Sequence, residues 1–335
     1  MLLIISTKLK IYFLFILQDH PYQVLNRNLE PVKKTIRIGT RESQLALWQA
    51  HTVEKQLNDL GYTTEIIKVK SEGDIVLDKP LYELGITGIF TKTLDIALIN
   101  GSIDIAVHSM KDVPTILANG VVQTAVLERH NPSDILVFNE NTDFLNHEKA
   151  IVATGSLRRK AQWLNRYPNH EIPDLRGNVN TRLQKLKDNG WNGAIFAQAG
   201  LDRIDVKPEN HIVLDWMIPA PSQGAVVVVC MNDNEFCMEA TQKLNHKPTE
   251  ICTYVERDFL RTLEGGCTAP IGALAEVKGD KIHFTGVLLS LDGKQKIEIE
   301  KAVDTSEYQS LGKNSALEIL AKGGAEIMEE IRKQL

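Results

Sequence analysis

The chain has 335 residues, of which 43% are hydrophobic and 24% are charged, so it is large enough for two or three globular domains. Its 38 basic and 43 acidic side chains give a net charge of −5, which argues against nucleic acid or an acidic membrane surface as a partner. The four cysteines are too few and too scattered for a disulfide framework or a zinc site, so we expect a reducing compartment and no metal.

Residues 1–33 differ in composition from the rest of the chain. They contain two apolar clusters separated by Lys8 and Lys10, and the second cluster is shorter than the roughly 20 residues that span a bilayer. No small-residue cleavage site follows, as a secretory signal would need. We expect a disordered extension, such as one added by an upstream start codon, with an export signal as the alternative. The folded chain is expected to begin near Lys34.

From Thr35 onward, short apolar runs alternate with amphipathic stretches. Ser43 is placed to cap a helix that Gly61 would end. The first expected elements are a strand at 35–40, a helix at 43–61, a strand at 63–70, a helix at 89–101 and a strand at 104–110. Such strand–helix–strand succession predicts a mostly parallel sheet covered by helices.

A second set of alternating elements follows, and the chain then changes character. This set has a strand at 149–155, a helix at 156–167, a strand at 170–177, a helix at 180–190 and a strand at 193–200. A further apolar strand run, 218–230, is expected to cross back to the first lobe. Last come a helix at 250–264, an antiparallel meander at 271–303 with Gly-Asp and Asp-Gly turns, and a helix at 315–334. We therefore expect domain 1 at 34–130 with 224–243, domain 2 at 131–223, and domain 3 at 247–335.

Positively charged side chains recur where expected strands end and expected helices begin. These positions are Arg41, Lys92, Lys111, Arg158, Arg159, Arg176 and Arg182. Free backbone N–H groups at helix starts favour anions, and the planar fork of arginine suits carboxylates. Any one of these residues could be an ordinary solvated cation. As a set they predict an anion-binding cleft, without naming the anion.

Asp112 is the single acid among these cations. It could be a structural partner of Lys111, or a carboxylate that stabilises a cationic intermediate or shuttles a proton. His108, four residues earlier, is expected to be packed or hydrogen-bonded, not a ligand.

Cys267 lies in the stretch LEGGCTAPIG. Gly265 and Gly266 leave room beside the thiol, and Pro270 stiffens the exit, although a tight turn explains the same pattern. No histidine partner is apparent, so we interpret Cys267 as an attachment point, not a recycling nucleophile. Cys230, within an apolar run, is expected to be an inert core thiol.

Several motifs together resemble one enzyme family. In chain order they are IRIGTRESQLALWQAH, GIFTK, DIAVHSMKDVP, SLRR, LRGNVNTRL, SQGA and LEGGCTAPIG. The chain is similar to the hydroxymethylbilane synthases (porphobilinogen deaminases) of tetrapyrrole biosynthesis, from Thr35 to the C-terminus. The resemblance implies two periplasmic-binding-protein-like (type II) α/β lobes plus a smaller C-terminal α+β domain with an antiparallel sheet.

The resemblance also implies a chemistry. Cys267 would carry a dipyrromethane cofactor through a thioether, and Asp112 would assist as the aminomethyl group of porphobilinogen leaves as ammonia. The resulting azafulvene is attacked by the free α-position of the terminal pyrrole. Four such condensations precede hydrolytic release of 1-hydroxymethylbilane.

Further roles follow by matching positions to the family motifs. The residues implied to hold the cofactor are Lys111, Ser109, Arg158, Arg159, Lys92 and Thr154, and those implied to hold the substrate are Arg41, Ser43, Arg176, Arg182 and Gln223. Thr87, Thr93 and Gly155 replace a lysine, a glutamate and a serine that are common in the family. We expect these departures at most to weaken substrate binding or alter chain handling. The family also implies a cytoplasmic monomer.

Two other functions fit parts of the pattern. A non-catalytic two-lobed anion-binding protein would share the lobes and the cations, but it needs neither Asp112 nor a glycine-flanked cysteine. A cysteine-dependent transferase with a transient thioester would have a reactive, alkylatable Cys267.

Overall fold

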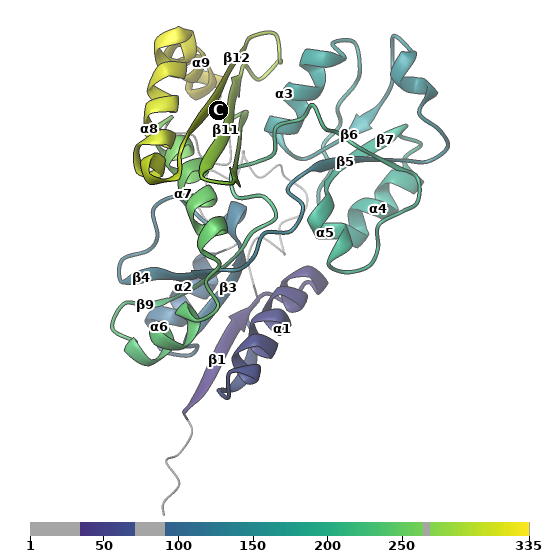
Figure 1. Ribbon diagram of the computed structural model, residues 1–335. Coiled ribbons are helices and arrows are strands. Elements are labelled where there is room, and N and C mark those ends of the chain that lie inside the picture. The colour runs from purple at the N-terminus through teal and green to yellow at the C-terminus, as the bar shows by residue number, and fades with distance from the viewer. Residues whose placement is uncertain (1–33, 71–90, 264–268, 335) are drawn as a thin grey trace, which may run out of the picture. The chain divides into compact units, whose positions relative to one another are not determined.

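The computed structural model describes residues 34–70, 91–263 and 269–334 (Figure 1). By contacts the chain divides into residues 1–34 and 35–335, and the fold below is that of the second unit. Three predictions fall outside the described residues: the disordered extension 1–33, Cys267 with its flanking glycines, and Thr87.

The first sheet has five strands in the order β2-β1-β3-β9-β4. Its strands are β1 (Thr35–Thr40), β2 (Thr63–Lys68), β3 (Ile105–Ser109), β4 (Val121–Val126) and β9 (Val226–Met231), with helices α1 (Gln44–Asp59), α2 (Lys92–Ile99) and α6 (Glu235–Gln242) and the 3-10 turn η3 (Met110–Asp112). β1 runs parallel to β2 and β3, whereas β9 runs antiparallel to β3 and β4. The expectation of a mostly parallel sheet is therefore confirmed, because β2, β1, β3 and β4 all run in one direction and β9 alone runs against them.

The local signals around α1 are confirmed. The Ser43 hydroxyl accepts a hydrogen bond from the Ala46 amide at 3.3 Å, which caps the helix. Gly61 has φ +87°, the left-handed conformation that ends a helix at little cost for glycine. Ile36 and Ile38 alternate inward from β1 and are completely buried.

The second sheet has four strands in the order β6-β7-β5-β8. It contains β5 (Asp134–Phe138), β6 (Val152–Ala153), β7 (Gly193–Ala197) and β8 (His211–Val213), with helices α3 (Leu157–Arg166), α4 (Val179–Asp188) and α5 (Gln198–Asp202) and the 3-10 turn η4 (Asp143–Asn146). Only the β6–β7 pair is parallel. The strand expected at 170–177 is reduced to one bridge between Ile151 and Glu171, since Pro173 has no N–H to donate.

The C-terminal part is built on a three-stranded antiparallel meander, β10-β11-β12, as expected. Its elements are α7 (Lys247–Thr262), β10 (Ile271–Lys278), β11 (Lys281–Leu289), β12 (Lys296–Asp304), the 3-10 turn η5 (Thr305–Glu307), α8 (Tyr308–Ile319), the π turn η6 (Leu320–Gly324) and α9 (Ala325–Gln334). The single helix expected at 315–334 is wrong. Gly323 adopts φ +102°, so the chain forms two helices joined by η6.

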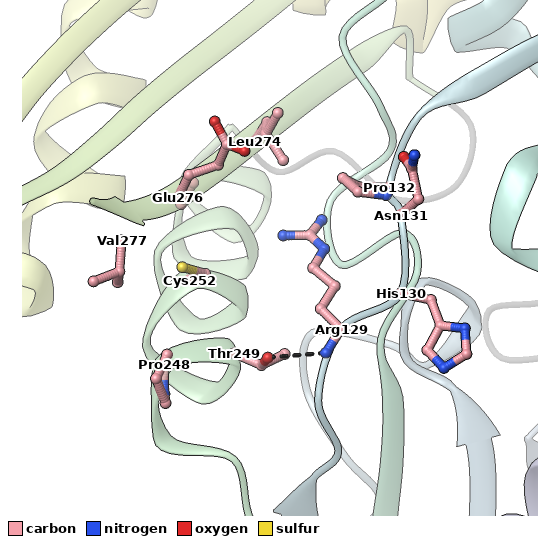
Figure 2. Close-up of a pocket in the computed structure, with 11 residues that line it drawn as sticks. Arg129, His130, Asn131, Pro132, Pro248, Thr249, Cys252, Leu274, Glu276 and Val277 are labelled. Atoms are coloured by element: carbon pink, nitrogen blue, oxygen red, sulfur yellow. Dashed lines mark hydrogen bonds between the residues drawn. The ribbon is translucent and has the colours of Figure 1, made fainter. Parts of the chain in front are cut away.

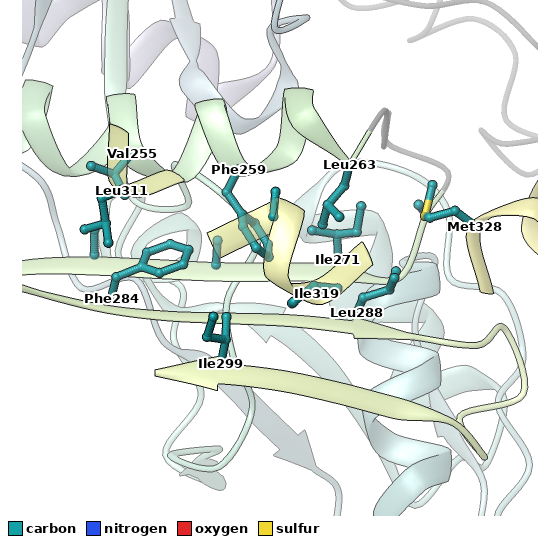
Figure 3. Close-up of a cluster of buried hydrophobic side chains, with 14 of the residues drawn as sticks. Val255, Phe259, Leu263, Ile271, Phe284, Leu288, Ile299, Leu311, Ile319 and Met328 are labelled. Carbon is teal, nitrogen blue, oxygen red and sulfur yellow. The ribbon is translucent and has the colours of Figure 1, made fainter. Parts of the chain in front are cut away.

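The core of this part lies between the helices and the meander (Figure 3). Phe259 of α7 meets Phe284 of β11 edge to face, with ring centroids 5.2 Å apart. Glycine at 286 leaves the space for this contact, because a Cβ there would lie 2.7 Å from the Phe259 ring. The predicted fold class, two α/β units plus a smaller α+β unit, is confirmed by the three sheets.

None of the helices in the described ranges combines the length and the apolar character needed to cross a bilayer.

Candidate active site

The ends of β1 and β3 bring the first group of predicted residues together. Because these parallel strands end at the same edge of the sheet, the loop after β1 meets the η3 turn after β3. A cavity of about 70 Å³ forms there, and its lining includes Arg41, Ser43, Ser109 and Asp112. The sequence therefore identified this edge correctly.

Two further residues of this cavity were not predicted as ligands. Gln49 of α1 is almost fully buried, and its amide nitrogen donates to the Ser109 hydroxyl at 2.8 Å. His108 is also buried, and its Nε2 has no hydrogen-bond partner among the described residues. Burial, and next the charge of Arg41, lower the pKa of His108 to about 4, so its ring is neutral at pH 7. In the sequence, the position of Gln49 six residues after the helix cap Ser43 was the signal that could have identified it.

In the second lobe, Arg158 and Arg159 are buried instead of solvated. Both belong to the first turn of α3, which Ser156 caps, and each is 5% exposed. Asp134, the first residue of β5, accepts from Arg158 Nη1 at 2.6 Å and from Arg159 Nε at 3.0 Å. Asp134 is completely buried. Burial alone would raise its pKa, but the charges of the two arginines outweigh burial and lower the pKa to about 2.

Gln223 links this ion cluster to the first lobe. Its amide nitrogen donates to Asp134 Oδ1 at 2.8 Å, and its amide oxygen accepts from Lys111 Nζ at 3.4 Å. Burial lowers the pKa of Lys111 to about 8, although the charge of neighbouring Asp112 opposes that shift.

Arg176 and Arg182 add to the same concentration of charge. Arg182 donates from Nε to the Gly177 carbonyl at 2.7 Å, which ties the first turn of α4 to the loop before it. Burial, and next repulsion by Arg159, lower the pKa of Arg182 to about 10; Asp112 acts in the opposite direction, and Arg176 adds repulsion. Burial also lowers the pKa of Arg176 and of Arg159.

These interactions place five cations and three carboxylates within one electrostatic cluster. The cations are Lys111, Arg158, Arg159, Arg176 and Arg182, and the carboxylates are Asp112, Asp134 and Asp174. Asp112 thus interacts with cations of both lobes, which its position next to Lys111 in the sequence did not reveal. The excess of positive charge suits a ligand with several carboxylates.

Other predicted residues lie differently. Lys92 begins α2 and is exposed, and Thr154 is buried with its hydroxyl accepting from the Ser156 amide at 3.3 Å. Gly155 lies so close to the chain at Leu175 that a Cβ would be 2.6 Å from the Leu175 carbonyl oxygen. The sequence analysis did not identify Asp134 as a site residue. The feature that could have indicated it is an acidic side chain directly before the apolar run ILVF.

A larger cavity of about 260 Å³ contains none of the predicted residues (Figure 2). Its lining comes from residues 129–132, from the start of α7 and from β10. Two charged residues line it, and both are already ion-paired. Glu276 pairs with Lys278, and Arg129 pairs with Glu256. The chemistry of the molecule therefore points to the cation cluster, not to this cavity.

Comparison with known proteins shows the family of the chain. One family model, described as porphobilinogen deaminase, dipyromethane cofactor binding domain, matches residues 36–239, and a second, described as porphobilinogen deaminase, C-terminal domain, matches residues 250–321. A porphobilinogen deaminase of Syntrophomonas wolfei is 38% identical over 90% of this chain and 100% of its own length. Those of Geotalea uraniireducens and Carboxydothermus hydrogenoformans are each 40% identical, over 89% and 90% of this chain and 95% and 99% of their own. Among solved structures, an arginine transport system periplasmic binding protein from Legionella pneumophila aligns with 62% of this chain and 91% of its own at 12% identity, with a TM-score of 0.37.

Proposed function

This chain belongs to the porphobilinogen deaminase family, and on that premise we propose how its own residues carry out the reaction. It is a hydroxymethylbilane synthase, a transferase of tetrapyrrole biosynthesis with a domain that binds dipyrromethane. The substrate is porphobilinogen, four molecules of which are joined with loss of ammonia into linear 1-hydroxymethylbilane.

The residues present fit a dipyrromethane. Each pyrrole unit bears an acetate and a propionate, so a two-pyrrole group brings four carboxylates. The cluster holds five cations against three carboxylates, and repulsion by Arg159 and Arg176 contributes to the lowered pKa of Arg182. Bound carboxylates would offset that repulsion and raise the pKa of Arg182 again.

The chain's own residues divide into two roles. The cations of both lobes hold substrate and cofactor carboxylates and keep the growing chain in place. The proposed holding residues are Arg41, Ser43, Lys92, Ser109, Lys111, Thr154, Arg158, Arg159, Arg176, Arg182 and Gln223. Asp112 provides negative charge where positive charge develops on the substrate as ammonia leaves. When bound, the dipyrromethane supplies the nucleophilic α-position that starts the chain.

One observation carries this assignment: Asp112 lines the cavity at the end of β1 and β3 and interacts with buried cations of both lobes. A site built only to bind anions gains nothing from a carboxylate at that point, because it repels the ligand.

Cys267 is proposed as the attachment point. The family match and the glycine-flanked motif support it, and so does the state of the other thiols. Cys230, Cys237 and Cys252 are buried, and burial raises the pKa of Cys230 to about 12 and that of Cys252 to about 11. Such thiols form the nucleophilic thiolate poorly.

The domain division expected from the sequence remains a proposal. Pairing of β9 with β3 and β4 supports assigning 224–243 to domain 1 with 34–130, leaving 131–223 as domain 2 and 247–335 as domain 3. A monomeric state and a cytoplasmic location are proposed from the family resemblance and from the absence of any Cys-x-x-Cys pair.

The intact mass of the purified chain tests the function. We expect a two-pyrrole adduct on the wild-type protein, none on Cys267→Ala, and an unchanged adduct on the control Cys237→Ala. Cys267→Ala is also expected to release no ammonia from porphobilinogen. A wild-type chain that produces bilane without any adduct would overturn the attachment, and one that binds porphobilinogen without releasing ammonia would support a simple anion-binding protein.

A further inference from the structure

Asp134 accepts more hydrogen bonds than any simple ion pair requires. Its two carboxylate oxygens receive Arg158 Nη1 at 2.6 Å, Arg159 Nε at 3.0 Å and Nη2 at 2.8 Å, and Gln223 Nε2 at 2.8 Å. The carboxylate is completely buried, so water cannot replace any of these partners. All three donor residues are among those proposed to hold the cofactor or the substrate.

Backbone carbonyl groups also accept hydrogen bonds from these three side chains. Arg158 Nη1 donates to the Ile218 carbonyl at 2.8 Å, and Arg159 Nη1 donates to the Ile195 carbonyl at 3.0 Å. Gln223 Nε2 donates to the Pro132 carbonyl at 2.7 Å. Each guanidinium group is therefore fixed from two sides, by a carboxylate and by a carbonyl.

The same network reaches the first lobe. Because Gln223 uses its nitrogen for Asp134, its amide oxygen is directed to Lys111 Nζ at 3.4 Å. Lys111 belongs to η3, next to Asp112. A chain of contacts thus runs from Asp134 through Gln223 to the residue adjoining the proposed catalytic carboxylate.

We infer that Asp134 is a positioning residue for chain elongation: its buried carboxylate fixes Arg158 and Arg159 and, through Gln223, Lys111, toward the pyrrole carboxylates. This inference rests on the proposed function. Cations that are already oriented need no rearrangement when a pyrrole carboxylate binds. They therefore hold the reacting pyrrole rings in the geometry of the transition state instead of in several loose arrangements.

A positioning role has a kinetic signature that differs from a binding role. Asp134→Asn removes a negative charge and retains every positive charge, so overall attraction for porphobilinogen should not weaken. The orientation of the arginines is lost, and displacement of about 1 Å can cost about 100-fold in rate. We therefore expect kcat to fall about 100-fold while KM stays within about threefold of the wild type.

The matched control is Asp104→Asn. Asp104 also binds an arginine, since Arg37 donates to it from Nε at 2.9 Å and from Nη2 at 2.8 Å. Asp104 directly precedes β3, at the opposite end of that strand from Ser109 and the η3 turn. We expect kcat of this variant to stay within about twofold of wild type, whatever its loss of stability.

The experiment uses the full-length purified protein with its adduct. Wild type, Asp134→Asn and Asp104→Asn are compared by intact mass, by thermal unfolding and by kcat and KM for porphobilinogen. Mass spectra taken during turnover also report which chain lengths accumulate on the protein. We expect folded Asp134→Asn to carry the adduct and to accumulate short chains.

Several outcomes would overturn the inference. Wild-type kcat in folded Asp134→Asn is one, and an equal loss of kcat in Asp104→Asn is another, because the effect would then follow stability alone. If Asp134→Asn does not fold, Gln223→Met is tested instead. This substitution removes the hydrogen bond to Lys111 and leaves the buried ion pairs of Asp134 intact, so wild-type kinetics in that variant would contradict the inference. Failure of the proposed function is distinct, since it would show as a wild-type protein without adduct.

Discussion

Arg129 and Glu256 form a two-point ion pair, with Nη1–Oε1 at 2.6 Å and Nη2–Oε2 at 3.1 Å, and the glutamate is completely buried. The same carboxylate accepts from the Ser222 amide at 2.6 Å and from the Ala275 amide at 2.8 Å. The Arg129 backbone amide donates to Thr249 Oγ1 at 3.1 Å (Figure 2). The Glu256 side chain of α7 therefore connects three segments: Arg129 after β4, Ser222 before β9, and Ala275 in β10.

Glu256→Gln should destabilise the protein strongly. It leaves the largely buried Arg129 guanidinium, 11% exposed, without its countercharge. Breaking a buried pair in this way costs about 3–5 kcal/mol of unfolding free energy. Urea unfolding measures the loss. The control is Glu318→Gln, on the surface between Lys301 and Lys322, where we expect little change. Equal midpoints for the two variants would contradict the central role of Glu256.

Activity should depend on the protonation of Lys111. Because burial lowers its pKa to about 8, the side chain is cationic below that pH and loses its charge as the pH rises through it. Attraction for substrate carboxylates falls in the same direction. We expect kcat/KM for porphobilinogen to fall by up to about tenfold between pH 7 and pH 9.

Lys111→Arg provides the control for this pH dependence, because arginine keeps its charge throughout that range. The variant should have a flatter profile above pH 7 even if its absolute rate is lower. A wild-type profile that stays flat to pH 9, or the same fall in both proteins, would assign the titration to another group.

Gly155→Ser should lower stability instead of restoring a useful hydroxyl. A Cβ at this position would lie 2.6 Å from the Leu175 carbonyl oxygen, and backbone cannot move aside cheaply. We expect a loss of about 1–3 kcal/mol, typical of overpacking, measured by thermal unfolding. Gly200→Ala in α5 is the control, since its nearest contact would be 3.7 Å, and it should be neutral or slightly stabilising. A Gly155→Ser protein as stable as wild type would show that this backbone relaxes.

Gly312→Ala should separate α8 from α7. A Cβ there would overlap the Val255 carbonyl oxygen and lie 2.9 Å from the Phe259 amide nitrogen. The expected cost is about 1–3 kcal/mol by urea unfolding, because two helix backbones must part. Lys313→Ala, one residue along and exposed, should cost nothing, since alanine is the better helix former. Similar values for both substitutions would rule out close α7–α8 contact as the cause.

Features that depend on neighbouring residues were predictable from the sequence alone. The Ser43 cap, the Gly61 stop and the meander turn at Gly279 follow from the backbone preferences of single residues. The recurrence of cations at strand ends likewise predicted the edge of the sheet where Arg41 and Asp112 meet, because parallel strands bring their ends together.

What the sequence determined about this protein is its α/β and α+β elements, its cation-lined edge and its family, all carried by local patterns and motifs. Only the tertiary structure decided the direction of β9, the need for glycine at 155, and the partners of Asp134, which lies 24 residues from Arg158 and 89 from Gln223. Burial is the physical reason: a carboxylate acquires such partners only where folding removes water from all of them at once, and no window of sequence records which distant groups will meet.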